Sequence, residues 1–183
     1  MTVLLTAEVA VEGLVQPLSL TLHAGRPLTI LGETGSGKSL LAQAILGTLP
    51  KGLQAQGSAR IGDVVLDLAR PQGHRALWGR VLSVLPQEPW LSLDPLMRAE
   101  GQVAEGYALV RGRDRATARA EALADLGDLG LAHATDRRPW ELSGGMAQRV
   151  AFAAARAGGA RIVVADEPTK GLDAAHLVAA AAF

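Results

Sequence analysis

Alternating apolar and polar side chains mark the beginning of the chain. Residues 3–11 and 18–23 follow this two-residue period imperfectly, as half-buried β-strands do. Residues 57–66 repeat the pattern on both sides of Gly62 and Asp63, a pair that favours the tight turn of a hairpin. This part of the chain predicts an N-terminal antiparallel β region.

Longer apolar runs follow at residues 27–31, 80–85 and 161–165. Runs of this kind are typical of strands buried inside a sheet. Residues 40–46 continue the first run as an apolar stretch that predicts a helix. Strands and helices that alternate in this way predict an α/β fold.

Strand-like runs disappear from residue 88 to residue 157. This part has the composition of helices at residues 99–111, 114–126 and 145–157. We therefore expect an α/β core of residues 1–87 and 158–183 that carries an inserted helical subdomain of residues 88–157.

Composition and charge narrow the possible functions. The 183 residues suffice for one domain with an inserted lobe. The 18 basic and 18 acidic residues balance, so we expect no nucleic-acid partner. The absence of cysteine excludes disulfides and thiolate metal sites. Arginines in the helical subdomain are expected to form a solvated face: Arg111, Arg113, Arg115 and Arg119.

The chain shows no apolar run long enough to span a membrane. Its N-terminus carries Glu8 and Glu12 and lacks the basic start of a signal peptide. We therefore expect a cytoplasmic location, with any membrane association made through a partner.

The candidate chemistry centres on a glycine-rich stretch between the predicted strand 27–31 and the predicted helix 40–46. It fits G-x-x-x-x-G-K-[ST] at every fixed position, with Gly32, Glu33, Thr34, Gly35, Ser36, Gly37, Lys38 and Ser39. The glycines let backbone N–H groups converge on a phosphate at the positive helix N-terminus. Lys38 would reach the β- and γ-phosphates, and Ser39 would hold Mg²⁺. A plain glycine-rich turn is the alternative, and the flanking strand and helix disfavour it.

Two carboxylates follow the predicted strand 161–165. In a parallel sheet, Asp166 and Glu167 would face the ligand crevice beside the phosphate loop. Asp166 would then hold Mg²⁺ through water, and Glu167 would orient or deprotonate the attacking water. An acidic pair here can also start a loop or cap a helix, but the phosphate loop favours catalysis.

A second candidate anion site precedes the predicted helix 145–157. Ser143 is a possible N-cap there, and Gly144 and Gly145 would expose backbone N–H groups. Taken alone, this stretch is an ordinary capped turn.

These motifs resemble the nucleotide-binding subunit of an ATP-binding-cassette (ABC) transporter. Residues 32–39 are similar to Walker A, residues 142–150 to the signature motif and residues 162–167 to Walker B. Residues 171–174 are similar to the D-loop and Gln87 to the Q-loop, all in family order. The resemblance implies a P-loop NTPase core of the ABC ATPase type, with the antiparallel region and the helical subdomain described above.

The resemblance implies that two ATP molecules are sandwiched between two such subunits. Ser143, Gly144 and Gly145 would then contact the γ-phosphate held by Lys38 and Ser39 of the other subunit. Catalysis would fall to Glu167, Gln87 and Lys38. The metal would be held by Ser39, Gln87 and Asp166, and Asp173 would contact the nucleotide site and communicate across the dimer.

Residues 86–95 and 141–146 are similar to the ATPases of oligopeptide, dipeptide and nickel importers. This implies ATP hydrolysis that energises solute uptake, at the inner face of the cell membrane. Permease subunits would be direct partners and a solute-binding protein an indirect one. Two alternatives remain: a truncated or degenerate cassette with little turnover, and a soluble ABC ATPase outside transport.

The chain departs from the family pattern in two ways. It stops at Phe183, before the histidine that the family places beyond the D-loop, so we expect a C-terminally truncated core. No aromatic residue precedes Trp78, so the usual adenine-stacking residue is missing. Base binding would then rest on apolar contacts near Val11 to Val15.

Residues 88–95 carry apolar side chains, among them Trp90, Leu91 and Leu93. They either pack inside the helical subdomain or receive a short helix of the permease.

Overall fold

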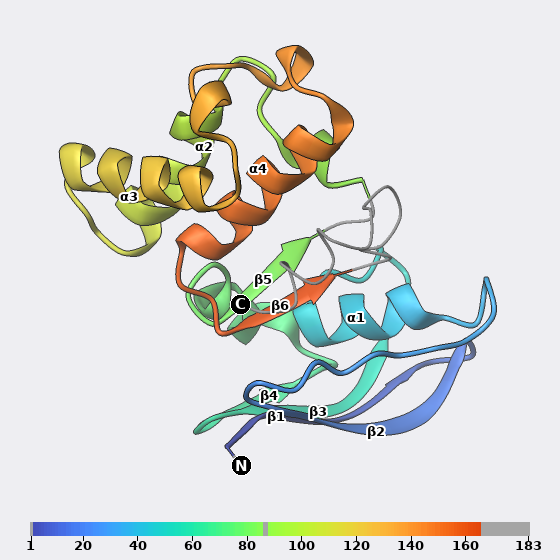
Figure 1. Cartoon of the computed structure of the whole chain (residues 1–183). Coiled ribbons are helices and arrows are strands. Elements are labelled where there is room, and N and C mark those ends of the chain that lie inside the picture. The colour runs from blue at the N-terminus through green and yellow to red at the C-terminus, as the bar shows by residue number, and fades with distance from the viewer. Residues whose placement is uncertain (1, 86–87, 166–183) are drawn as a thin grey trace. The chain divides into compact units, whose positions relative to one another are not determined.

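The computed structural model describes residues 2–85 and 88–165, without the side chains of Pro89 and Trp90. The chain divides into two compact units, residues 1–77 and residues 78–183 (Figure 1). No helix in the described ranges is long and apolar enough to cross a membrane.

The first unit contains a four-stranded antiparallel sheet in the order β2-β1-β3-β4. Its strands are β1 (Val3–Val11), β2 (Val15–His23), β3 (Ala55–Ile61) and β4 (Val64–Asp67). Along β1, Leu5, Ala7 and Val9 are buried, as the alternating pattern predicts. Ile61 pairs with Val64 across the predicted turn, so the hairpin is confirmed.

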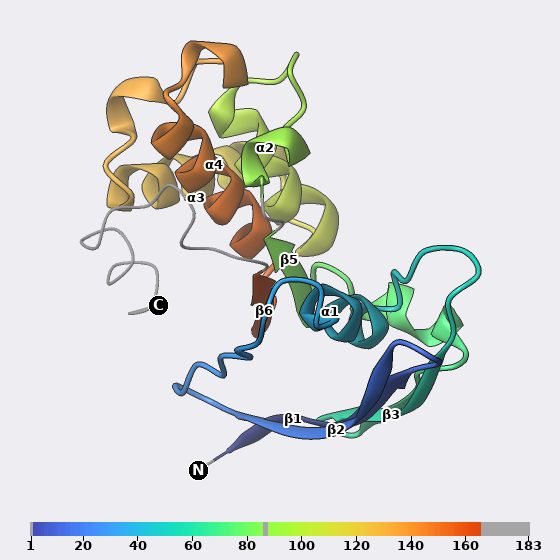
Figure 2. The ribbon, with the colours of Figure 1, turned by 90° about the vertical axis from the view of Figure 1, so that its right-hand side faces the viewer.

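Helix α1 (Lys38–Leu46) packs against β1 on one face of this sheet (Figure 2). Its apolar residues Leu41, Ala44 and Ile45 are buried, which confirms the predicted helix. The helix ends at Gly47, whose positive φ of 71° lets the chain turn away. The 3₁₀-helix η1 (Pro71–Leu77) follows β4.

Residues 27–31 do not form the strand predicted for them. They lie outside every strand of the described chain, and Leu31 is 88% exposed. A strand forms only where a neighbouring backbone accepts and donates its hydrogen bonds. No described strand pairs with these residues, so an apolar run did not suffice to make them one.

The second unit contains the parallel pair β5 (Leu82–Leu85) and β6 (Ile162–Ala165). Leu82 lies opposite Ile162, and Leu85 lies opposite Ala165. Both predicted strands are thus present. Leu82, Leu85 and Ile162 are buried, whereas Val84 and Val163 remain exposed.

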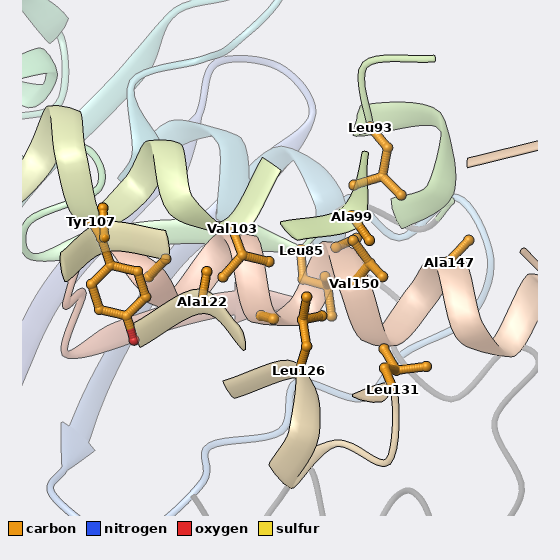
Figure 3. Packing of buried hydrophobic residues seen from close by; sticks show 14 residues of the cluster. Leu85, Leu93, Ala99, Val103, Tyr107, Ala122, Leu126, Leu131, Ala147 and Val150 are labelled. Atoms are coloured by element: carbon orange, nitrogen blue, oxygen red, sulfur yellow. The ribbon is translucent and has the colours of Figure 1, made fainter. Parts of the chain in front are cut away.

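The helices of the second unit are α2 (Ala99–Glu105), α3 (Arg115–Asp128) and α4 (Gly144–Ala157). Shorter turns are η2 (Pro89–Ser92), η4 (Ala132–Ala134) and η5 (Pro139–Glu141). Figure 3 shows Val103 of α2, Leu126 of α3 and Val150 of α4 packed together in one apolar core. The three helices therefore share one apolar core, which also includes Leu85 of β5.

The predicted helix 99–111 contains a change of helix type. Its second half is the π-helix η3 (Gly106–Val110). Tyr107 of this turn donates a 2.6 Å hydrogen bond to Asp125 Oδ2. Burial first, and then this hydrogen bond, raise the pKa of Tyr107 to about 12. The π turn thus anchors α2 to α3.

The expected solvated face of arginines is confirmed. Arg111, Arg113, Arg115 and Arg119 are all exposed. Arg113 and Arg119 form surface ion pairs of 3.2 Å with Glu121 and 3.0 Å with Glu100. Exposed pairs of this kind contribute about 0–1 kcal/mol each, so the face is chiefly a solvated one.

Candidate functional site

The phosphate loop, residues 32–39, runs directly into α1. Gly35 and Gly37 have positive φ values of 84° and 89°, which other residues rarely adopt. A Cβ at Gly32 would lie 2.8 Å from the Ser36 hydroxyl oxygen, so a side chain there would displace that hydroxyl. Gly37 is the N-cap of α1 and has no side chain to cap it, which leaves first-turn N–H groups for a ligand.

Lys38 folds back over the loop. Its ammonium donates hydrogen bonds of 2.8 Å to the carbonyl of Gly32 and 2.7 Å to that of Glu33. An ammonium has three donors, so one remains for an anion. The loop thus carries positive charge at its mouth, beside the free N–H groups of α1.

An apolar patch adjoins the phosphate loop. A Cβ at Gly37 would overlap the side chain of Val15, so this valine lies directly against the loop. Leu14 is exposed, whereas Val11 is buried in the core. Of the apolar residues in the stretch predicted to contact the base, Leu14 and Val15 are thus accessible and Val11 is not.

The signature residues begin α4, as predicted. Ser143 is the N-cap, and its hydroxyl accepts a 3.3 Å hydrogen bond from the N–H of Met146. Gly144 and Gly145 have no atom within 4 Å of the position of a Cβ, so they border open space. Ser143 and Gly144 are exposed, and the start of α4 can therefore meet an anion from outside.

Arg149 holds the signature helix in place, a role that the sequence analysis missed. Its Nη1 donates a 2.8 Å hydrogen bond to the carbonyl of Leu129 at the end of α3. Its Nε donates a 3.3 Å bond to the carbonyl of Gly145, one turn earlier on α4. No local sequence pattern marks this role, because both partners of the guanidinium are backbone carbonyls.

The turn η5 directly precedes the signature residues and was also missed. Glu141 Oε2 accepts a 2.8 Å hydrogen bond from the N–H of Arg138. In return, the N–H of Glu141 donates a 2.9 Å hydrogen bond to the carbonyl of Arg138. The Arg138 guanidinium lies 5.2 Å from the centre of the Trp140 ring. Trp140 is nevertheless 60% exposed.

The remaining predicted site residues lie outside the described part of the chain. These are Gln87 after β5 and Asp166, Glu167 and Asp173 after β6. The described strands themselves end opposite each other, at Leu85 and Ala165. The phosphate loop belongs to the first unit and the signature residues to the second.

The second unit also contains a cavity of about 320 Å³. Its lining includes Leu93 and Met97 together with Gln102 and Ala151. Leu93 is buried and belongs to the helical core, whereas Leu91 is 72% exposed. Of the apolar residues predicted either to pack inside or to receive a partner, Leu93 therefore packs inside and Leu91 faces outward. The side chain of Trp90 lies outside the described part of the chain.

Comparison with protein families gives one match over most of the chain. The model of the family described as ABC transporter matches residues 15–170. Among solved structures, CbiO1 from Clostridium perfringens, part of the ABC transporter complex CbiONQ, has a TM-score of 0.81 at 23% identity. The match covers 100% of this chain and 73% of that one, and at this identity it concerns the fold.

Several relatives are similar over most of this chain. An uncharacterized ABC transporter ATP-binding protein of Escherichia coli, YejF, is 39% identical over 89% of this chain and 32% of its own length. The oligopeptide transport protein OppD of Haemophilus influenzae is 37% identical over 87% of this chain and 50% of its own length. The glutathione import protein GsiA of Pectobacterium atrosepticum is 38% identical over 87% of this chain and 27% of its own length. The chain thus spans between about a quarter and a half of these relatives.

Proposed function

Because the chain belongs to the ABC transporter family, whose ATP-binding domains bind nucleotide, we propose that it binds and hydrolyses Mg-ATP to energise import. The observation that carries this proposal is the pairing of two anion sites in one chain. One is the uncapped start of α1 with Lys38, and the other is the exposed start of α4 at Ser143.

We propose that the two sites act on the same nucleotide from two copies of the fold. The charge that develops on a transferred phosphoryl group spreads over three oxygens, which need donors on several sides. The phosphate loop supplies Lys38 and the N–H groups of α1. Ser143, Gly144 and Gly145 of the second copy would supply the others and exclude water on closure.

We propose that Mg²⁺ is held by the Ser39 hydroxyl and the Gln87 amide oxygen, and by the Asp166 carboxylate through water. All three are oxygen donors, which Mg²⁺ prefers. Bound there, Mg²⁺ would neutralise charge on the β- and γ-phosphates. The parallel strands that end together at Leu85 and Ala165 support a shared site for the residues that follow them.

Glu167 is the proposed general base. Its carboxylate would accept a proton from the water that attacks the γ-phosphorus, while the bond to the β-phosphate oxygen breaks and ADP leaves. Lys38 would stabilise the charge on the leaving and transferred phosphates. Asp173 would contact the nucleotide site from across the dimer.

We further propose a peptide-like or nickel solute and a location at the inner face of the cell membrane. The names of OppD and GsiA, which concern oligopeptide and glutathione transport, support such a solute. The partners would be a second ATPase subunit and permease subunits, with a solute-binding protein beyond them. The cavity beside Leu93 and the exposed Leu91 support docking of a permease segment.

Glu167→Gln tests the proposal, since it keeps the shape of the side chain and removes the base. We expect Mg-ATP binding to persist, steady-state hydrolysis to fall by about 100-fold or more, and an ATP-bound dimer to accumulate. Glu8→Gln, at an exposed position on β1, is the matched control and should leave hydrolysis unchanged. Unaltered phosphate release by the Glu167→Gln variant would assign the base to another residue.

A further inference from the structure

Trp140 combines exposure with a fixed position beside the signature residues. It is the most exposed of the aromatic side chains that the structure describes. Its turn is tied at both ends by the hydrogen bonds between Arg138 and Glu141. An apolar ring of this size costs free energy when left in water, and the rigid turn presents it without further ordering.

We infer that Trp140 stacks on the adenine of the ATP bound by a second copy of the chain. The inference rests on the proposed sandwich and names the residue that recognises the base within it. The Arg138 guanidinium lies over the indole at 5.2 Å, and 60% of Trp140 remains exposed to receive a planar ligand. A base on the indole would extend this stack.

The phosphate-loop unit itself has no aromatic residue to hold a base. Residues 1–77 contain no Phe, Tyr or Trp. Accessible apolar side chains beside the loop, among them Val15 and Leu31, offer contact area but no π-face. A stacking partner must therefore come from elsewhere, and the second copy is the source that already touches the nucleotide.

The spacing along the chain fits this geometry. Trp140 precedes Ser143 by three residues, a stretch that spans at most about 10 Å. This reach is comparable to the ribose and triphosphate that separate adenine from the γ-phosphate. With Ser143 at the γ-phosphate, Trp140 can lie at the base, opposite the aliphatic patch of Leu14 and Val15.

A fluorescent ATP analogue with 2-aminopurine as its base tests the inference, because stacking quenches this base. The full chain carrying Glu167→Gln would be mixed with the analogue and Mg²⁺, and dimers would be identified by light scattering. We expect quenching that appears only with the dimer. Trp140→Ala should abolish most of it and weaken nucleotide-driven dimerisation by about tenfold, the scale of one base–aromatic stack. Trp140→Phe should retain both.

Leu109→Ala, at an exposed apolar position of the same unit, is the matched control and should change neither quantity. Mg-ATP affinity of the monomer, measured at low protein concentration, should be equal in all variants, because the contact is made in trans. Quenching that persists in the Trp140→Ala dimer would overturn the inference, as would a dimer with no quenching at all.

Other outcomes assign Trp140 elsewhere. An equal loss of monomer affinity in Trp140→Ala would place the effect within one copy and overturn a role in trans. Unchanged quenching with weaker assembly on a permease would make Trp140 a protein contact instead. A chain that stays monomeric with ATP overturns the proposed sandwich itself, whereas a dimer without stacking overturns only the role of Trp140.

Discussion

At the scale of single residues, the Lys38 ammonium has hydrogen-bond donors for two purposes, to hold the phosphate loop and to bind a phosphate. Its ammonium closes the phosphate loop through the carbonyls of Gly32 and Glu33, and it keeps one donor for a phosphate. Charge-assisted hydrogen bonds to phosphate are roughly twice as strong as neutral ones. We therefore expect the lysine both to shape the loop and to attract a phosphate ligand.

Lys38→Ala should remove both contributions. We expect Mg-ATP affinity to fall by about 2 kcal/mol or more, on the scale of hydrogen bonds to charged groups. Titration calorimetry measures this directly. Lys51→Ala, at an exposed lysine beyond α1, removes the same charge and should leave the affinity unchanged. Equal affinities for the Lys38→Ala variant and the unmodified chain would rule out residues 32–39 as the phosphate site.

At the scale of elements, the start of α1 depends on a glycine in close contact. Gly37 combines a φ of 89° with the side chain of Val15, which a Cβ would overlap. Gly35 has a similar φ of 84° but has no atom near the position of a Cβ. A residue with a side chain would thus have a strained backbone at either position, whereas steric crowding would arise only at Gly37.

Gly35→Ala and Gly37→Ala should therefore differ. We expect the left-handed backbone to destabilise each variant by about 1–2 kcal/mol. Gly37→Ala should lose further stability and most of its Mg-ATP affinity, because its Cβ would overlap Val15. The double variant Gly37→Ala with Val15→Ala should recover part of that additional loss. Chemical denaturation and nucleotide titration measure the two effects. Equal losses for both glycines, with no recovery in the double variant, would show that Val15 does not constrain the loop.

Elements with a local signature could be predicted from the sequence. The β3–β4 hairpin follows from its turn residues, and α1 and α4 follow from a glycine loop and a serine cap. Residues 27–31 could not be predicted, because a strand depends on a neighbour that local sequence does not specify. The π turn that begins at Gly106 was not predicted for a related reason. A Cβ at Gly106 would lie 2.6 Å from the Cβ of Ala157, and this close approach arises only in the folded unit.

The candidate site was predictable to a similar extent. Its motif residues follow from glycine spacing and helix caps, which are local. Arg149 and Trp140 were missed because each acts through a single side chain, with no periodic pattern around it. Their roles depend on what lies beside them in space: the end of α3 for Arg149 and the Arg138 guanidinium for Trp140.

At the scale of the whole molecule, the proposed function requires the second unit to contact both the nucleotide and a partner protein. Its α4 begins with the signature residues, and Ala151 farther along the same helix lines the cavity beside Leu93. One rigid helix thus joins the proposed nucleotide contact to the proposed docking site. Closure around ATP and attachment to the permease would then move the same body.

Leu91→Ala tests this arrangement. Leu91 is 72% exposed and adjoins Ser92 and Leu93 of the cavity lining. Loss of an exposed apolar anchor should weaken assembly with the permease by about tenfold, with Mg-ATP affinity and the stability of the isolated chain little changed. Leu109→Ala, at an equally exposed leucine outside the cavity lining, is the control. Co-purification and transport-coupled ATPase assays of the complex measure the effect. Normal assembly of the Leu91→Ala chain, with stimulated hydrolysis intact, would show that the permease docks on another surface.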